Sequence, residues 1–330
     1  MKKMKCIIYD SGSDSSDLRL AKVDIPEIGP NEVLIRVFFA GVNRPDILQR
    51  LGKYEPPRDA SKILGLEASG EIVKIGSLVT RWQVGDKVTS LLHGGGYAEF
   101  AIANQYQCLR IPDKMSLLHA GALCENYFTV WENLFRRGKL TSGENVLIHG
   151  GTSGIGTTAI QLANHFGANV WATVGSEKKC QFCRDLGALD VVNYNDQNFL
   201  DFFVNRGQPI SMDIIMDMVG GDYIEKNIDL LNEDGRLIFI AFLKGSLQQI
   251  NFAKIMVKRL TLCGSTLRPQ SLYVKAQIAE GLNQYIWPLL DQKIIEPIID
   301  SVFDLKDVSE AHKKMESSAH IGKIMLKVLN

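Results

Sequence analysis

The first third of the chain consists of short apolar runs that are broken by glycine and proline. Turn residues separate the runs, among them Gly29-Pro30 and Gly85. Short strands at this spacing, joined by tight turns, are typical of an antiparallel β-barrel. We therefore predict a barrel-like β domain at the start of the chain. Its β-like runs lie at residues 6–9, 32–42, 68–76 and 86–92.

From Leu117 the pattern becomes helical, with apolar residues at intervals of three and four. Beyond this helix, short apolar strands alternate with helical segments. Such an alternation predicts a parallel sheet with helices on both faces, so the fold class is α/β with a doubly wound sheet. Its strands are expected at residues 145–149, 169–174, 191–194, 213–218, 235–241 and 260–263, with helices at 177–186 and about 222–231.

The tail of the chain combines an amphipathic helix with two further β-like runs, IIEPIIDSVFDL and GKIMLKVL. These runs are most simply explained as strands that rejoin the first domain. A chain of 330 residues is longer than one hydrophobic core usually serves, so two domains are expected. We therefore predict a discontinuous first domain, residues 1–125 and 269–330, interrupted by a second domain at residues 126–268.

The balance of charges narrows the classes of partner. Lys plus Arg and Asp plus Glu both number 37, which gives a formal net charge of zero at pH 7. This balance argues against a dedicated nucleic-acid or anionic-membrane binder, so a small-molecule partner is expected. No run of 18 apolar residues occurs, and no transmembrane helix is predicted.

The six cysteines are scattered through the sequence, which favours a reducing compartment and a cytoplasmic location. One close pair, Cys180 and Cys183, falls in a helical stretch, where positions three apart simply share a face. No second CxxC and no HxxxH accompanies this pair. We therefore interpret the pair as structural and predict no metal site.

A glycine-rich turn between a strand and a helix is the strongest local signal. The strand at 145–149 leads into Gly150-Gly151-Thr152-Ser153-Gly154-Ile155-Gly156, and a helical pattern follows directly. Such a turn lets backbone amides at a helix N-terminus approach the pyrophosphate of a dinucleotide. Further alternating strands and helices follow, which favours this interpretation over an ordinary tight turn. The predicted cofactor contacts here are Thr152, Ser153, Gly154 and Ile155.

The end of the next strand distinguishes NADPH from NADH. NAD-binding units usually carry Asp or Glu there, whose carboxylate holds the ribose hydroxyls. This chain has Gly175-Ser176 instead, and Lys178 or Lys179 close behind can supply a charge-assisted hydrogen bond, which favours an additional phosphate. The intervening Glu177 is explained as a charge at a helix N-terminus. We predict NADPH, held by Gly175, Ser176 and Lys179. Tyr194 either flanks the adenine or ribose or is an ordinary core tyrosine.

Several longer segments are similar to those of one known family. They are AGVNRPD at 40–46, LGKYEPP at 51–57, ILGLEASGE at 63–71, GGGYAE at 94–99, the glycine turn, NY at 193–194 and HIGKI at 320–324. With these segments the chain resembles the zinc-independent quinone oxidoreductases of the medium-chain dehydrogenase/reductase superfamily, the zeta-crystallin-like group. The resemblance implies a GroES-like β-barrel catalytic domain and a Rossmann domain that binds NADPH.

The chain departs from the zinc alcohol dehydrogenases of the same superfamily. It has Asn43 where those enzymes carry a cysteine ligand, and Leu66 in place of the histidine before Glu67. Cys124 stands near a third ligand position, but with Glu67 alone it cannot complete the three protein ligands of a catalytic zinc. We therefore expect no metal and no alcohol oxidation through a metal-bound alkoxide.

The resemblance also implies roles for single residues. Asn43 and Tyr54 are expected beside the nicotinamide and the acceptor, where an amide and a phenol hold a developing oxyanion or contact a flat ring. The alternatives are a turn-forming asparagine and a half-buried loop tyrosine. Further cofactor contacts are expected at Thr129, Phe242, Ser265, Leu267 and Lys323. The alternative for Thr129 is an ordinary threonine inside a helix, and Lys323 lies either near the phosphates or, solvated, at a strand end.

The function implied by the resemblance is NADPH-dependent, zinc-independent quinone reduction. A quinone accepts hydride readily because reduction restores an aromatic ring, so the protein mainly orients the reactants and excludes water. One alternative is a reductase of α,β-unsaturated carbonyl compounds, such as alkenals or enoyl thioesters. Another is a crystallin-like or RNA-binding protein that retains NADPH. A homodimer is expected, with residues 251–264 at its edge.

Overall fold

The computed structural model describes residues 2–329. The chain divides into two compact units, which we call the barrel unit (Met1–Phe128 with Leu267–Asn330) and the α/β unit (Thr129–Thr266). Both boundaries lie within three residues of those expected from the sequence. No helix among the described residues is long and apolar enough to span a membrane.

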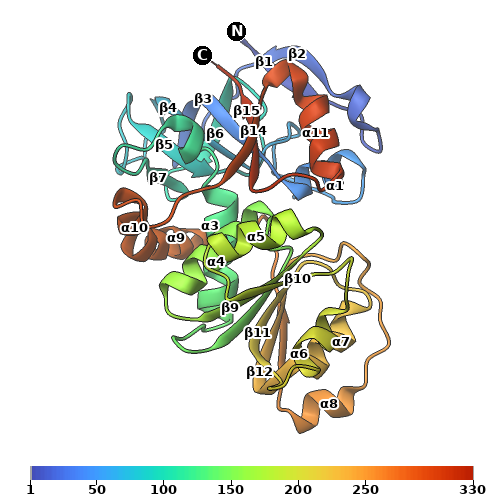
Figure 1. Ribbon diagram of the computed structural model, residues 1–330. Coiled ribbons are helices and arrows are strands. Elements are labelled where there is room, and N and C mark those ends of the chain that lie inside the picture. Colours follow the sequence, from blue (N-terminus) through green and yellow to red (C-terminus); the bar gives the residue numbers. More distant parts are fainter. Residues whose placement is uncertain (1, 330) are drawn as a thin grey trace. The chain divides into compact units, whose positions relative to one another are not determined.

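The barrel unit is built mainly from antiparallel strands (Figure 1). The main sheet has the order β14-β15-β3-β4-β5-β7, with β6 also paired to β3, and β1 and β2 form a separate pair. The last strand, β15, lies antiparallel to β3, with Met325 opposite Gly41, so the tail returns to the first domain. The strands are β1 (Lys3–Ile8), β2 (Arg19–Asp24), β3 (Glu32–Val42), β4 (Glu67–Ile75), β5 (Lys87–Leu91), β6 (Phe100–Asn104), β7 (Cys108–Arg110), β14 (Ile299–Asp304) and β15 (Lys323–Lys327).

Helices flank this sheet, and α1 follows β3 directly. Helix α1 begins after Asn43, whose backbone N–H donates to the Asp46 carboxylate at 2.9 Å, and it carries a proline in its first turn. Such a start is favourable because Pro45 has no N–H to satisfy there. The helices of this unit are α1 (Arg44–Arg50), α2 (Leu117–Ala120), α3 (Cys124–Val130, ending in the α/β unit), α9 (Leu272–Gly281), the π-helical η3 (Leu282–Ile286), α10 (Trp287–Asp291) and α11 (Val308–Glu316), with 3-10 turns η1 (Ser15–Asp17) and η4 (Leu305–Asp307).

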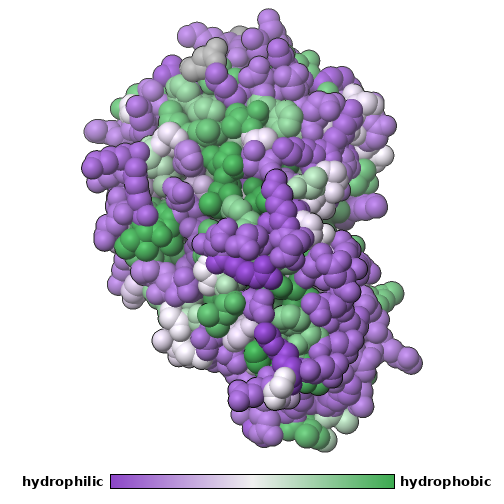
Figure 2. Space-filling view, in the orientation of Figure 1, coloured by the Kyte–Doolittle hydropathy of each residue, from purple (hydrophilic) through white to green (hydrophobic). Residues whose placement is uncertain are grey.

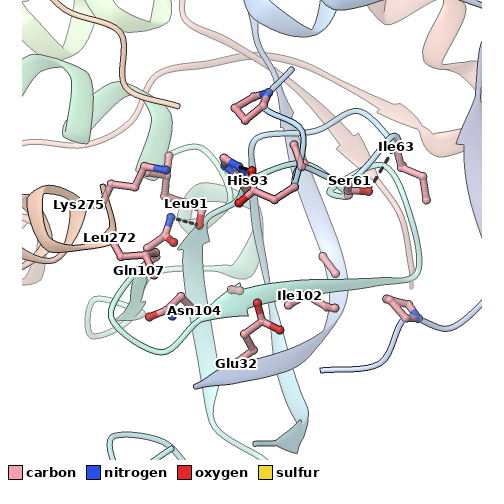
Figure 3. A pocket seen from close by; sticks show the side chains of 18 of the residues that line it. Glu32, Ser61, Ile63, Leu91, His93, Ile102, Asn104, Gln107, Leu272 and Lys275 are labelled. Carbon is pink, nitrogen blue, oxygen red and sulfur yellow. Dashed lines mark hydrogen bonds and ion pairs between the residues drawn. The ribbon is translucent and has the colours of Figure 1, made fainter. Parts of the chain in front are cut away.

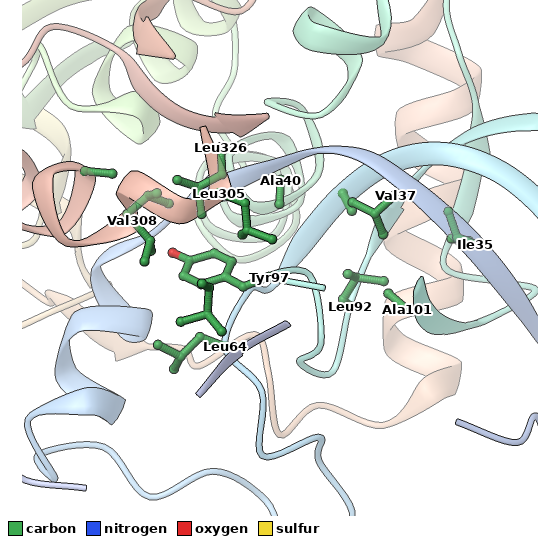
Figure 4. Close-up of a cluster of buried hydrophobic side chains, with 14 of the residues drawn as sticks. Ile35, Val37, Ala40, Leu64, Leu92, Tyr97, Ala101, Leu305, Val308 and Leu326 are labelled. Atoms are coloured by element: carbon green, nitrogen blue, oxygen red, sulfur yellow. The ribbon is translucent and has the colours of Figure 1, made fainter. Parts of the chain in front are cut away.

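The core of the barrel unit joins the two segments of its discontinuous chain. Figure 4 shows the ring of Tyr97 surrounded by Leu64 from the first segment and by Leu305, Val308 and Leu326 from the last. All five side chains are buried. Because apolar burial is the main force that stabilises a fold, this shared core holds the C-terminal segment against the N-terminal one.

The α/β unit contains a six-stranded parallel sheet in the order β10-β9-β8-β11-β12-β13. This is the strand order of a Rossmann fold, in which the order reverses between the first and fourth strands. The strands are β8 (Asn145–His149), β9 (Asn169–Val174), β10 (Asp190–Asn193), β11 (Met212–Asp217), β12 (Leu231–Phe239) and β13 (Thr261–Gly264). The helices are the π-helical η2 (Trp131–Arg137), α4 (Gly154–His165), α5 (Glu177–Asp185), α6 (Phe199–Val204), α7 (Tyr223–Leu230) and α8 (Phe252–Val257).

Helix α8 carries an apolar surface. Phe252, Met256 and Val257 are each more than 60% exposed, and the apolar atoms at the lower end of Figure 2 lie over this helix. The neighbouring strand β13 is the last strand of the sheet. The dimer predicted at residues 251–264 concerns this region, and it stays a prediction.

Candidate functional site

The glycine turn of the α/β unit is closely packed against backbone. A Cβ added to Gly156 would lie 2.3 Å from the carbonyl oxygen of Gly150, and one added to Gly151 would lie 2.8 Å from Ala172 Cβ. Gly150 itself has a φ of +74°, which favours glycine. The turn therefore needs glycine at all three positions, and its tightness brings the start of α4 close to the end of β8.

The start of α4 has the features of a pyrophosphate-binding site. Ser153 caps the helix, because its hydroxyl oxygen accepts the Gly156 N–H at 2.9 Å. The next residues, Gly154 and Ile155, form the first turn, where N–H groups have no partner inside a helix. Thr152 is buried beside them at 4% exposure. These residues fit the diphosphate of a dinucleotide, whose negative charge the helix N-terminus favours.

The end of β9 carries no carboxylate directed at a ribose. Ser176 caps α5 with its hydroxyl, and the carboxylate of Glu177 accepts a hydrogen bond from Arg184 at 3.0 Å. The phenol of Tyr194 lies against Gly175, since a Cβ there would be 2.6 Å from its oxygen. The first turn of α5, which includes Lys179, follows directly, and a contact of these residues with a 2′-phosphate stays a prediction.

At the other end of the sheet, a buried asparagine joins two of the predicted cofactor residues. Asn133 donates from Nδ2 to the carbonyl oxygen of Thr129 at 2.8 Å, and its Oδ1 accepts the Ser265 hydroxyl at 2.9 Å. Phe242 lies beyond the end of β12, with its ring stacked on Phe239 at 5.2 Å between centroids. Sequence reasoning did not identify Asn133. Its helical position gave no signal of these contacts.

In the barrel unit, three buried residues from distant parts of the chain form a polar cluster. Asn43 donates from Nδ2 to Glu67 Oε1 at 3.0 Å, and Lys323 Nζ donates to Asn43 Oδ1 at 2.6 Å and to Glu67. None of the three is more than 8% exposed. A Cβ at Gly41 would overlap the Glu67 carboxylate, so this glycine makes room for the cluster.

Glu125 adds a second carboxyl group beside the cluster. Its backbone N–H donates to Glu67 Oε2 at 2.9 Å. Burial, together with the charge of Glu67, raises the pKa of Glu125 to about 8. The side chain is therefore mainly protonated at neutral pH and adds little negative charge to this buried region. No motif around Glu125 indicates this role.

Tyr54 lies half-buried in the loop after α1, beneath an arginine. The Arg268 guanidinium carbon is 5.8 Å from the centre of the Tyr54 ring, a distance typical of a cation–π contact. Arg268 also donates to Gln49 Oε1 at 2.6 Å and to the carbonyl oxygen of His93 at 3.1 Å. Burial raises the pKa of Tyr54, so its phenol stays protonated at neutral pH and can donate a hydrogen bond. Leu267 immediately precedes this arginine.

Comparison with known proteins places this geometry in a family. The chain matches the "Alcohol dehydrogenase GroES-like domain" over residues 29–113 and the "Zinc-binding dehydrogenase" family over residues 154–280. It is 29% identical to the Homo sapiens quinone oxidoreductase over 306 residues, which covers 92% of this chain and 91% of that protein. The chain belongs to the quinone oxidoreductase-like family of the medium-chain dehydrogenase/reductase superfamily.

Solved structures agree with this assignment. The quinone oxidoreductase from Coxiella burnetii has a TM-score of 0.83 at 27% identity, covering 99% of this chain and 100% of that one. The JamJ enoyl reductase has a TM-score of 0.88 at 26% identity, covering 99% of both chains. The predicted fold class, a GroES-like domain with a Rossmann domain, is thereby confirmed. A family member of this kind is an oxidoreductase whose α/β domain implies a nicotinamide cofactor.

The zinc in the family description does not fit the residues of this member. Where a metal would need ligands, the Lys323 ammonium already neutralises Glu67 and bonds to Asn43. Cys124 is 3.3 Å from Thr89 Oγ1, and burial raises the pKa of its thiol well above the usual range, although zinc needs a thiolate. Within residues 2–329, no group of three or more His, Cys, Asp or Glu side chains is arranged to hold a metal ion.

The contacts of Lys323 also change the role expected for it. The sequence comparison suggested a contact with the cofactor phosphates. The ammonium is only 3% exposed and donates to two partners inside the barrel unit. A buried ammonium whose charge is already neutralised by Glu67 would interact only weakly with a phosphate. Lys323 is therefore better described as a partner of Asn43 and Glu67.

Proposed function

We propose that this oxidoreductase is an NADPH-dependent, zinc-independent quinone reductase. The single observation that carries the cofactor assignment is the end of β9. No carboxylate stands there to hold the ribose hydroxyls of NAD or to repel a 2′-phosphate, and Glu177 is paired with Arg184. Ser176, Lys179 and the exposed phenol of Tyr194 supply the donors that a phosphate requires.

The acceptor assignment rests on the polar cluster of the barrel unit. NADPH, when bound, supplies a hydride. With no fit for a Lewis-acidic metal, the protein suits acceptors that take hydride without one, and quinones are such acceptors because the product is aromatic. The protonated Tyr54 phenol would donate to the acceptor oxygen on which charge develops. The side chain of Asn43 is fixed by Glu67 and Lys323, so it would hold a constant position beside the reactants.

Cofactor binding tests the first part of this proposal. NADPH should bind at least about tenfold more tightly than NADH in a fluorescence titration, because charge-assisted hydrogen bonds to the extra phosphate add about 1.4 kcal/mol or more. Lys179→Ala should reduce this difference. Lys178→Ala is the matched control, since the side chain of this neighbouring lysine is exposed. Equal affinities of the unaltered protein for the two cofactors would refute the assignment.

A second candidate function is the reduction of α,β-unsaturated carbonyl compounds, which the similarity to enoyl reductases supports. That reaction ends with protonation of carbon, so it depends more on an acid such as Tyr54. Oxidation of NADPH should be followed with ortho- and para-quinones, alkenals and enoyl thioesters. If Tyr54→Phe keeps near-full quinone turnover but loses about tenfold or more with enones, the protein is an enone reductase.

A further inference from the structure

Lys275 is a buried cation without an ion-pair partner. It lies in helix α9, is only 3% exposed, and donates from Nζ to the carbonyl oxygen of Arg268 at 2.7 Å. Among the described residues no carboxylate oxygen lies within 4.0 Å of this ammonium. A buried charge is unfavourable unless it is paired, and one carbonyl contact leaves two of its three N–H donors for another partner.

Two carboxyl groups, Glu125 and Asp59, interact electrostatically with Lys275, but neither neutralises its charge at neutral pH. Glu125 is mainly protonated, because burial raises its pKa to about 8. Asp59 has an 85% exposed side chain and is bonded to His93 at 3.2 Å, so its charge is largely solvated. Burial also lowers the pKa of His93, which leaves this imidazole uncharged at pH 7. Burial lowers the pKa of the Lys275 ammonium, and the charge of the nearby Arg268 guanidinium acts in the same direction. Lys275 therefore lacks a counter-charge that a bound anion would supply.

Lys275 lines a cavity that lies wholly within the barrel unit. The cavity has a volume of about 650 Å³, within the range of small-molecule sites. Figure 3 shows Lys275, His93, Leu91 and Gln107 at one end of it and Ile63 and Ile102 toward the other. The apolar side chains would suit an aliphatic or aromatic part of a ligand, and the end with Lys275 would suit a polar group. The first turn of α9 borders the same end and adds the positive end of its helix dipole.

The structure assigns to this cavity a function that the hydride-transfer site does not explain. We propose that it binds a small molecule with one carboxylate and an apolar body, the carboxylate pairing with Lys275. Among the described residues that line the cavity, Lys275 is the one charged lysine, and a single charge matches a carboxylate better than a phosphate. Three carboxylates also line the cavity, and each has a partner: Asp59 is bonded to His93 at 3.2 Å, Asp24 is 3.9 Å from Lys3, and Glu32 accepts the Gly29 N–H at 2.6 Å. Asn43 and Tyr54 do not line the cavity, so the site is separate from the residues proposed to act on the acceptor.

Equilibrium binding of a matched pair of probes tests this site. 2-Naphthoate and its methyl ester have the same aromatic body, and only the acid carries a charge. Isothermal titration of the full chain should show the acid binding about tenfold or more tightly than the ester. Lys275→Met should remove this preference. Lys306→Met, at a side chain that is 69% exposed in the same unit, should leave it unchanged.

A second variant keeps the test decisive if Lys275→Met does not fold. Gln270 lines the cavity and is part-exposed, so Gln270→Glu adds a repelling charge without disturbing the core. It should weaken the acid several-fold and leave the ester unaffected. Equal binding of acid and ester, or an acid preference that survives both substitutions, would overturn the proposal. The readout is binding rather than turnover, so the result is independent of whether quinones are the acceptor.

Discussion

The glycine turn of the α/β unit and the polar cluster of the barrel unit show two ways of building a functional site. In the turn, the important residues are neighbours in sequence, and what they provide is backbone geometry. In the cluster, Asn43, Glu67 and Lys323 come from three distant segments and meet only through the pairing of β3, β4 and β15. A substitution in the turn should therefore destabilise the protein by steric overlap. A substitution in the cluster should destabilise it by leaving a buried charge without a partner.

Removing the cation of the cluster should give the largest effect. Lys323→Met leaves the Glu67 carboxylate fully buried beside a second acid, Glu125. Breaking a buried ion pair in this way typically costs about 3–5 kcal/mol. The free energy of unfolding, measured by chemical denaturation, should fall by this amount. The double variant Glu67→Gln/Lys323→Met should recover most of the loss, because no buried charge is then unpaired.

The control for this experiment is an exposed ion pair of the same unit. Lys313 contacts Glu310 at 2.8 Å, with side chains that are 55% and 60% exposed. Solvent screens such a pair, so Lys313→Met should change the free energy of unfolding far less than Lys323→Met does. If Lys323→Met were no more harmful than Lys313→Met, the cluster would not be a buried charge network.

The glycine turn should show the next largest effect, and it should be steric. Gly156→Ala places a Cβ 2.3 Å from a backbone oxygen, which forces α4 away from the turn. Overpacking of this kind costs about 3 kcal/mol, and it should also weaken NADPH binding in a fluorescence titration. Gly207→Ala is the matched control, because a Cβ there meets nothing within 4 Å. Equal stability of the two variants would contradict the close approach.

The smallest of the three effects should depend on pH. Burial raises the folded-state pKa of Glu125 to about 8 from an ordinary value of 4.5. The folded protein then binds a proton that the unfolded chain releases, so stability falls as pH rises from the unfolded pKa through the folded one. Between pH 6 and pH 8 this group should account for a loss of about 2 kcal/mol. Glu125→Gln should remove that loss, as thermal unfolding at the two pH values would show.

Most of the α/β unit could be predicted from the sequence. Its strands are continuous apolar runs, and Gly150 to Gly156 signal the turn without knowledge of the rest of the chain. Helix α6 went unpredicted because its segment, FLDFFV, is apolar nearly throughout and lacks a helical period. Phe199 and Phe203 are buried in the core, so tertiary packing decides its position.

The barrel unit was less predictable. Helix α1 was not predicted, because its segment was noted only for its similarity to a known family. Strands β6 and β7 are short and mixed in polarity, so neither alternation nor continuous hydrophobicity marked them. The position of Lys323 could not be inferred at all, because its partners are more than 250 residues away in sequence.

The sequence by itself determined the strands of the α/β unit, the glycine turn and the absence of a carboxylate at the end of β9. These depend on local geometry, which neighbouring residues specify directly. Only the tertiary structure decided that Lys323 neutralises Glu67 and that Lys275 is a buried cation at a cavity. The physical reason is that charge interactions in a protein depend on burial and on distance in space. Neither quantity can be read from positions along the chain.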